Sequence, residues 1–144
     1  MFEKVLVPID GSDISNKAID TARRMMEEGS AQEVTILTVV QPSDAMPFNG
    51  LNMPADFPAF FEEINKAAQK ILDRAEERMY MKENVKTQLE FGSPAEIICK
   101  TADQDKFDLI IIGNRGLNKL QRIMMGSVSS RVVALSPCPV LVVK

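Results

Sequence analysis

The sequence predicts an α/β fold in which an open five-stranded parallel sheet is sandwiched by four helices. Two observations lead to this prediction. Strand-like and helix-like segments alternate along the 144 residues, and most of the strand-like segments are continuous apolar runs. Strands of that kind are buried on both faces, as in parallel sheets that helices cover. A chain of this length is expected to form one domain, residues 1–144.

The first third of the chain contains two strands and a helix. KVLVPI at 4–9 is short, rich in β-branched residues and followed by a turn, so it predicts a buried strand. The next segment has apolar residues at helical spacing, can be capped by Ser12 or Asp13, and meets a stop signal at Gly29. VTILTVV at 34–40 predicts a second buried strand.

Residues 41–58 contain four prolines and are expected to form a loop without regular structure. This loop carries more apolar side chains than a purely solvated connection needs. We interpret it either as a lid or dimer-contact loop, or as a loop that packs on its own domain. The sequence does not decide between these two interpretations.

The middle of the chain predicts a long helix, a strand and a third helix. From 59 to 81, apolar residues follow helical spacing over about six turns. VKTQLEF at 85–91 alternates as a third strand. Ser93 is then expected to cap a helix with Pro94 at its first position, and Glu96 to complete a capping box.

The C-terminal part supplies the last two strands and the fourth helix. FDLIIIG at 107–113 is the most hydrophobic strand, SVSSRVVALS at 127–136 predicts the helix, and PVLVVK at 139–144 predicts the final strand. In open α/β sheets, ligands bind beyond the carboxyl ends of the strands, where the winding direction reverses. The segment that links the fourth strand to the fourth helix is therefore placed where a ligand is expected.

Composition excludes several function classes. The chain has no histidine, which removes the Ser-His-Asp triad, the Cys-His pair and the HExxH zinc site. Cys99 and Cys138 form no CxxC pair, so metal and redox sites have little support. No apolar run approaches the ~18 residues of a membrane span, and the N-terminus lacks the pattern of a signal peptide. These features predict a cytoplasmic protein without membrane contact.

The net charge of −3 hides an asymmetry along the chain. Residues 1–98 carry 10 basic and 17 acidic side chains, a net charge of −7, whereas residues 99–144 carry 7 basic and 3 acidic ones, a net charge of +4. A local positive field on an acidic protein fits a small anionic ligand better than a nucleic acid. The alternative is a merely solvated basic edge.

The segment GNRGLNKLQRIMMGSVSSR, which links the fourth strand to the fourth helix, has three glycines, four basic residues and no acid. Gly113 and Gly116 allow a sharp turn with inward amides, and Gly126 lets a phosphate approach without meeting a Cβ atom. Ser127 and Ser129 add hydroxyl donors at the positive end of the helix dipole. Neither GxxxxGK[ST] nor GxGxxG occurs in the chain.

The spacing G-x2-G-x9-G-[S/T] after the fourth strand resembles the hallmark of the universal stress protein family, specifically its ATP-binding branch. The opening KVLVPIDGS, the segment GSPAEII and the closing SPCPVLVVK are also similar to the family's patterns. The resemblance implies a Rossmann-like fold of the adenine nucleotide alpha hydrolase type, with strand order 3-2-1-4-5. It also implies a homodimer formed through the final strand, Val140–Val143.

Carried over by position, the resemblance implies an ATP site, with Mg²⁺ as a candidate companion ion and no assigned metal ligands. Asp10 would meet the adenine or ribose, Val39 would line the adenine slot near Ile112, and the glycine-rich residues would bracket ribose and phosphates. The implied set is Pro8, Ile9, Asp10, Val39, Ile112, Gly113, Asn114, Arg115, Gly116, Gly126, Ser127, Val128 and Ser129.

Simpler roles compete with several of these assignments. Asp10 could be only a turn residue or a helix cap, and Arg115 could point to solvent. Val39 and Ile112 would be core residues in any α/β protein.

Two function classes follow. The first is a cytoplasmic ATP-loaded sensor or regulator in the stress response, and the second is a slow ATPase or phosphoryl-transfer enzyme that uses the same pocket. The glycine-rich segment has no carboxylate to act as a base, and Asp10 alone is a candidate base or metal partner. Binding is therefore favoured over turnover, and no catalytic residue is assigned. A receiver domain phosphorylated at Asp10 would need further acids and a lysine that are not clear in the sequence.

Overall fold

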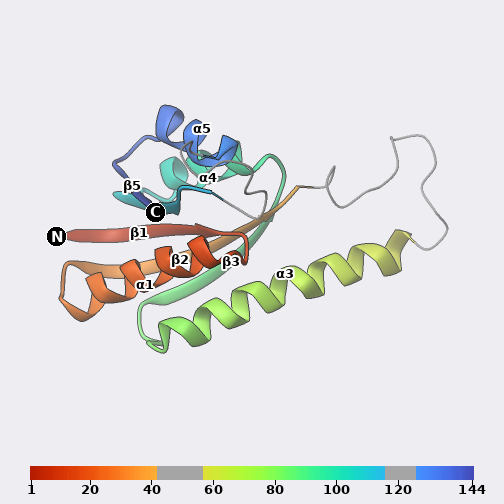
Figure 1. The fold of residues 1–144 in the computed structure, drawn as a ribbon, viewed down its shortest axis with the longest axis horizontal. Coiled ribbons are helices and arrows are strands. Elements are labelled where there is room, and N and C mark those ends of the chain that lie inside the picture. Colours follow the sequence, from red (N-terminus) through yellow and green to blue (C-terminus); the bar gives the residue numbers. More distant parts are fainter. Residues whose placement is uncertain (42–56, 116–125) are drawn as a thin grey trace.

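The computed structural model describes residues 1–41, 57–115 and 126–144. It shows a parallel sheet with helices on both faces (Figure 1). The elements, labelled as in Figure 1, are β1 (Phe2–Ile9), α1 (Asp13–Glu27), β2 (Ala31–Val40), α3 (Phe57–Met79), β3 (Val85–Phe91), α4 (Pro94–Gln104), β4 (Leu109–Gly113), α5 (Ser127–Leu135) and β5 (Val140–Val143). The predicted alternation of strands and helices is confirmed.

The five strands form one sheet in the order β3-β2-β1-β4-β5, and every neighbouring pair is parallel. This confirms the predicted fold class and strand order. The chain winds from β1 outward to β3, and then returns to the other side of β1 with β4. The winding direction therefore reverses between β1 and β4, where such sheets bind ligands.

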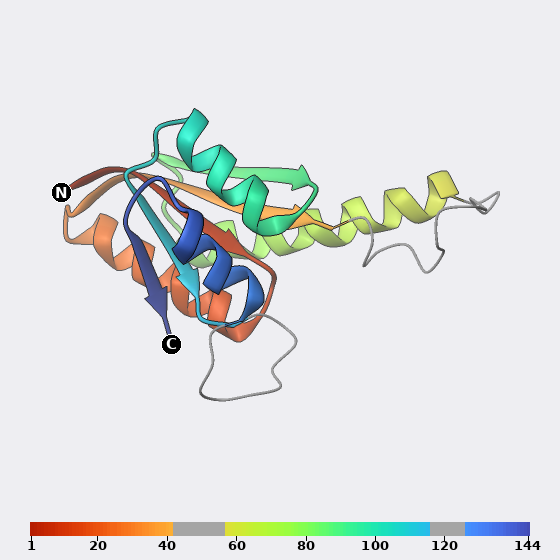
Figure 2. The same ribbon diagram turned by 90° about the horizontal axis from the view of Figure 1, so that it is seen from above.

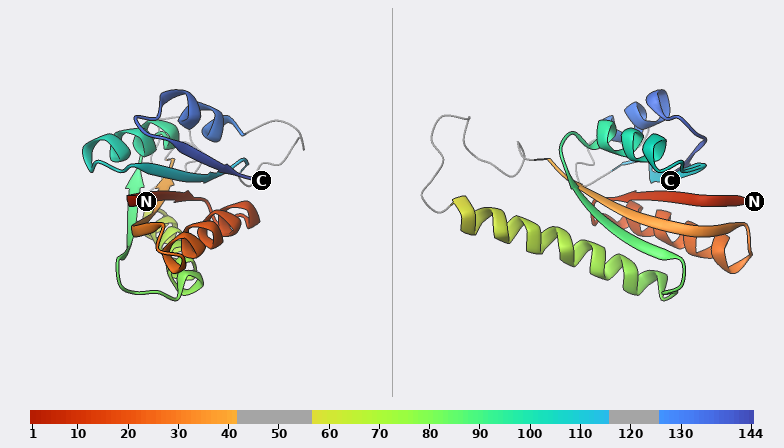
Figure 3. Two further views of the ribbon diagram at one scale, coloured as in Figure 1. Left: turned by 90° about the vertical axis from the view of Figure 1, so that its left-hand side faces the viewer. Right: turned by 180° about the vertical axis from the view of Figure 1, so that it is seen from behind.

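Helices cover both faces of the sheet (Figures 1 and 3), and a hydrophobic core lies on each face. On one face, Val5 and Val7 of β1 belong to the same buried cluster as Leu72 of α3. On the other face, Leu6 of β1 shares a cluster with Val132 of α5, and Figure 2 shows α4 and α5 lying over the strands. Successive residues of β1 thus point to opposite faces, as expected for a strand that is buried on both sides.

The capping predicted from the sequence is confirmed at the start of α1 and is wrong in part at the start of α4. Ser12 is the N-cap of α1, and its hydroxyl accepts a hydrogen bond from the Ser15 amide at 3.3 Å. Gly29 has φ of +74°, a conformation that glycine adopts readily. Ser93 is the N-cap of α4, with Pro94 in the first turn, but its side chain makes no capping bond, so the predicted capping box is wrong. Ser93 has ψ of 118°, against 164° at Ser12, and this rotation does not bring its hydroxyl to the helix amides.

Two sequence predictions fall outside the described residues. The loop predicted at 41–58 lies there except for its ends, and so does Gly116. Within the described part of the chain, no helix is long and apolar enough to cross a membrane.

Candidate functional site

The residues predicted to bind a ligand gather at the carboxyl edge of the sheet. Leu6 of β1 pairs with Ile110 of β4, so these two strands end side by side. Ile9 pairs with Thr38, which places the end of β2 at the same edge. Pro8 and Ile9 are buried at the end of β1. The residues directly after β1 and the first two residues after β4, Asn114 and Arg115, therefore lie at the same edge of the sheet.

Asp10 is fixed by hydrogen bonds to the first turn of α1. Its Oδ1 atom accepts the Ser15 hydroxyl at 2.7 Å and the Ser12 amide at 3.0 Å. The Asp10 amide in turn donates to the Ser15 hydroxyl at 3.0 Å. Asp10 therefore does act as a turn residue. Its Oδ2 atom makes no hydrogen bond to the described residues. Sequence reasoning missed Ser15, and the only available signal was a serine in the first turn of a helix that begins just after the aspartate.

The two ends of the glycine-rich segment meet each other. The Gly126 amide donates to the Asn114 carbonyl at 2.6 Å, and the buried Ser129 hydroxyl donates to the Gly113 carbonyl at 2.7 Å. The Asn114 amide donates to the Val143 carbonyl at 2.8 Å, extending the ladder between β4 and β5. These bonds fix the start of α5 against the end of β4.

The start of α5 presents free amide groups. Gly126 is the N-cap, and its carbonyl accepts the first helical bond from the Ser130 amide at 2.9 Å. As a glycine, it supplies no capping side chain. The amides of Ser127, Val128 and Ser129 have no hydrogen-bond partner among the described residues. Such donors at the positive end of a helix dipole are suited to the oxygen atoms of an anion.

The two glycines that the structure describes in this segment meet different surroundings. A Cβ atom on Gly113 would lie 2.0 Å from Cγ2 of Ile14, so the first turn of α1 needs a glycine there. A Cβ atom on Gly126 would lie 3.4 Å from the Asn114 carbonyl oxygen and from Cα of Arg115, which is ordinary contact. Neither glycine has a left-handed φ. Glycine's backbone freedom is therefore not needed for the turn at Gly113. The close approach of α1 instead depends on the absence of a Cβ atom there.

The predicted apolar residues of the site come together on one face of the sheet. Ile112 is buried, and the partly buried Val39 and Val128 pack against the same cluster, on the side of α4 and α5. Val39 and Ile112 are thus core residues in part, as the simpler interpretation expected. Arg115 is half-buried beside Gly126.

The resolved pKa shifts lie away from this edge. Burial, followed by the nearby Cys138 thiol, raises the pKa of Cys99. The hydrogen bond from Arg78 is the largest cause that lowers the pKa of Asp20. Across residues 1–41, 57–115 and 126–144, no three His, Cys, Asp or Glu side chains form a group that could hold a metal ion.

Comparison with known proteins places the chain among relatives over its whole length. A model of the universal stress protein family matches residues 1–144. Universal stress protein YxiE of Bacillus subtilis (strain 168) is 38% identical over 150 residues, an alignment that covers 100% of both proteins.

Solved structures share the fold. The protein MJ0577 is 27% identical with a TM-score of 0.85, over 100% of this chain and 96% of that one. A universal stress protein in complex with cAMP is 26% identical with a TM-score of 0.71, over 98% of this chain and 95% of the other.

Proposed function

Because this chain belongs to the universal stress protein family, we propose that it binds ATP at the carboxyl edge of its sheet. In this proposal it acts as a cytoplasmic nucleotide-dependent sensor or regulator in the stress response. The observation that supports it most strongly is the start of α5, where three amides without a partner among the described residues follow a glycine that adds no side chain.

The phosphate chain is proposed to lie against the amides of Ser127, Val128 and Ser129 and the exposed hydroxyl of Ser127. The Ser129 hydroxyl already donates to the Gly113 carbonyl, so this residue contributes its amide. Backbone amides at a helix N-terminus bind phosphate without a lysine, because the orphan donors and the helix dipole both favour negative charge.

The base is proposed to lie on the apolar surface formed by Val39, Ile112 and Val128, with Asp10 near the adenine or ribose. The free Oδ2 atom of Asp10 can accept a hydrogen bond from a ribose hydroxyl or from an adenine amino group. The relative in complex with cAMP supports an adenine nucleotide as the ligand class for this fold.

Binding is favoured over turnover. Asp10, the one candidate base, has Oδ1 committed to Ser12 and Ser15, and those bonds hold the carboxylate as part of the turn. Mg²⁺ would then be held by the phosphates and by water, with Asp10 as the candidate carboxylate that could join it. A slow ATPase is the alternative function of the same pocket.

We also propose a homodimer formed through β5. The strand order makes β5 an edge of the sheet, and no described strand pairs with its outer side. Leu141 of this strand is 41% exposed. An apolar edge of this kind is available for pairing with a second copy.

Calorimetric titration of the purified protein with ATP, GTP and cAMP tests the nucleotide proposal. ATP is expected to bind with 1:1 stoichiometry and more tightly than GTP, because an adenine slot lined by Val39 and neighbouring backbone matches adenine. At free ATP 100-fold above its Kd, the fold gains about 2.7 kcal/mol, which raises the Tm by several degrees. Equal affinity for ATP and GTP, or binding of neither, would contradict the proposal. Tight binding of cAMP with no binding of ATP would contradict the ATP assignment alone.

A further inference from the structure

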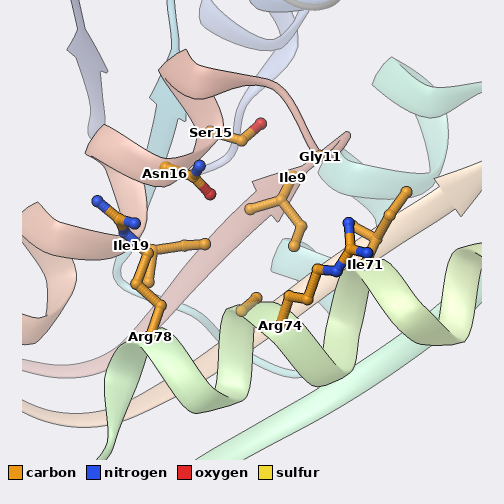
Figure 4. A pocket seen from close by; sticks show the side chains of 9 residues that line it. Ile9, Gly11, Ser15, Asn16, Ile19, Ile71, Arg74 and Arg78 are labelled. Carbon is orange, nitrogen blue, oxygen red and sulfur yellow. The ribbon is translucent and has the colours of Figure 1, made fainter.

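A pocket of about 270 Å³ lies between α1 and α3, on the face of the sheet away from α4 and α5 (Figure 4). Ile9, Ile19, Ile71 and Ala75 give it apolar walls. It shares only Ile9 with the residues predicted to bind nucleotide. Its volume is below the ~300–1,000 Å³ typical of pockets for drug-sized ligands, so it suits a molecule smaller than a nucleotide.

One positive charge in this pocket is not compensated. Two arginines of α3 line it, and no acidic side chain does. Arg78 is neutralised by Asp20, with N–O distances of 2.8 and 2.7 Å. Arg74, one turn earlier, has no hydrogen bond or ion pair within the described ranges. Within the described ranges, Arg74 therefore keeps an unpaired charge beside the pocket, whereas Arg78 does not.

A second polar group faces the same space from the other helix. Figure 4 shows Arg74 rising from α3 beside Ile9 and Ile71, with Asn16 of α1 across the pocket. The Asn16 side chain makes no hydrogen bond in the described part of the chain. The pocket thus combines a guanidinium, an amide and isoleucine walls.

We propose that this pocket binds a small carboxylate with a short unbranched apolar tail. The planar guanidinium of Arg74 matches a carboxylate through two parallel hydrogen bonds, and the Asn16 amide can donate a third. The tail then lies among Ile9, Ile19 and Ile71. A monoanion balances the single uncompensated charge. This proposal does not depend on nucleotide binding, because the carboxylate occupies a different face of the sheet.

Hexanoate is the probe, and binding is followed by calorimetry and by the methyl NMR signals of Ile9, Ile19 and Ile71. Hexanoate is expected to bind 1:1 and to shift these methyl signals. Acetate, which lacks the tail, and 1-hexanol, which lacks the charge, are each expected to bind at least about tenfold more weakly. No binding of hexanoate, or equal binding of hexanol, would overturn the proposal.

Arg74→Gln tests the charged contact, and Arg24→Gln on α1 is the matched control. Both arginines are exposed, and Arg24 does not line the pocket. Arg74→Gln is expected to weaken hexanoate binding about tenfold or more, while Arg24→Gln leaves it unchanged. Circular dichroism confirms that both variants are folded. If Arg74→Gln binds hexanoate as tightly as the parent, the arginine serves only to cover apolar surface with its stem, and the proposal is wrong.

Discussion

Gly113 and Gly126 stand at the two ends of one glycine-rich segment, yet they are glycines for different reasons. At Gly113 a Cβ atom would come within 2.0 Å of Ile14, so the fold itself requires the residue. At Gly126 the nearest neighbours of a Cβ atom are at 3.4 Å, and the φ of −62° suits any residue. The described residues of the fold therefore give no reason for glycine at position 126.

This difference gives the two glycines different roles: Gly113 belongs to the structural framework of the fold, and Gly126 belongs to the proposed binding site. Gly113 lets α1 pack against the end of β4, and this packing holds the Asp10 turn beside the glycine-rich segment. Gly126 places no side chain at the start of α5, next to three amides that have no partner in the described part of the chain. A glycine that the fold does not need, at a place where an anion fits, is the physical basis of the ATP proposal.

The largest effect is expected from Gly113→Ala, which forces a methyl group against Ile14. Overpacking of this kind costs about 1–3 kcal/mol, and the short distance favours the upper end. Urea unfolding measures the loss. Gly126→Ala is the matched control, because it adds the same methyl group where there is room and changes only the N-cap, at a cost of up to about 1 kcal/mol. Equal stability losses in the two variants would remove the distinction between the two glycines.

On the site side, Ser127→Ala deletes one exposed hydroxyl at the start of α5. The lost contact to a charged phosphate is expected to cost about 1.5–3 kcal/mol, a roughly ten- to hundredfold loss of ATP affinity. AMP is expected to lose much less. Ser130→Ala, one position beyond the free amides, is the control and is expected to keep the parent's affinity. Calorimetry that gives equal losses for ATP and AMP would mean that Ser127 does not contact the phosphate chain.

Leu141→Lys tests whether β5, the edge strand next to β4, also forms a dimer interface. Leu141 is exposed, whereas Val142 packs against the core on the face of α4 and α5, so a charge at 142 would disturb the fold as well. The lysine is expected to weaken a dimer by at least about tenfold, because it places a charge in an apolar contact. Sedimentation at several concentrations measures this. A parent protein that is monomeric throughout would contradict the dimer.

The smallest effect concerns the ion pair that ties α1 to α3. Arg78 lowers the pKa of Asp20, so the pair stabilises the fold above the unfolded pKa of about 3.9, and this stabilisation is lost as the pH falls through the lower folded pKa. Asp20→Asn is expected to cost about 0.2–1 kcal/mol at neutral pH, because the pair is partly exposed. The difference from the parent shrinks in acid.

Asp103→Asn is the control for this ion pair, since the bridge between Asp103 and Lys106 is longer, at 3.7 Å, and both of its side chains are more exposed than those of Asp20 and Arg78. It is expected to change the free energy of unfolding by less than Asp20→Asn. A cost for Asp20→Asn that stays constant from neutral pH to acid would show that the ion pair is not its source.

Local patterns were enough to predict much of this fold. Continuous apolar runs predicted four of the five strands, because parallel strands buried on both faces need such runs, and alternation of apolar and polar residues predicted the third strand at 85–91. The strand order and the grouping of site residues followed from the family resemblance. Ser12 was correctly identified as one of two candidate caps, since capping depends on residues close in sequence.

The remaining features depend on contacts between distant segments. The need for glycine at 113 comes from Ile14 on another element, and the Ser129 hydroxyl finds its acceptor at the end of β4. Sequence alone could not show that this hydroxyl is already engaged. Ser93 shows that even a local prediction can fail. It is a suitable N-cap residue, but its ψ differs from that of Ser12 and its side chain makes no capping bond.

Gly126→Ser tests the central claim most directly, because it changes stability and binding in opposite directions. The extended backbone at 126 suits a serine N-cap, whose hydroxyl accepts a hydrogen bond from one of the free amides and adds a few tenths of a kcal/mol of stability. The same side chain takes the space and a donor proposed for the phosphates. Urea unfolding and ATP calorimetry on this variant are predicted to show a fold at least as stable as the parent and an ATP affinity at least about tenfold lower. A folded Gly126→Ser variant that binds ATP as tightly as the parent would contradict the account.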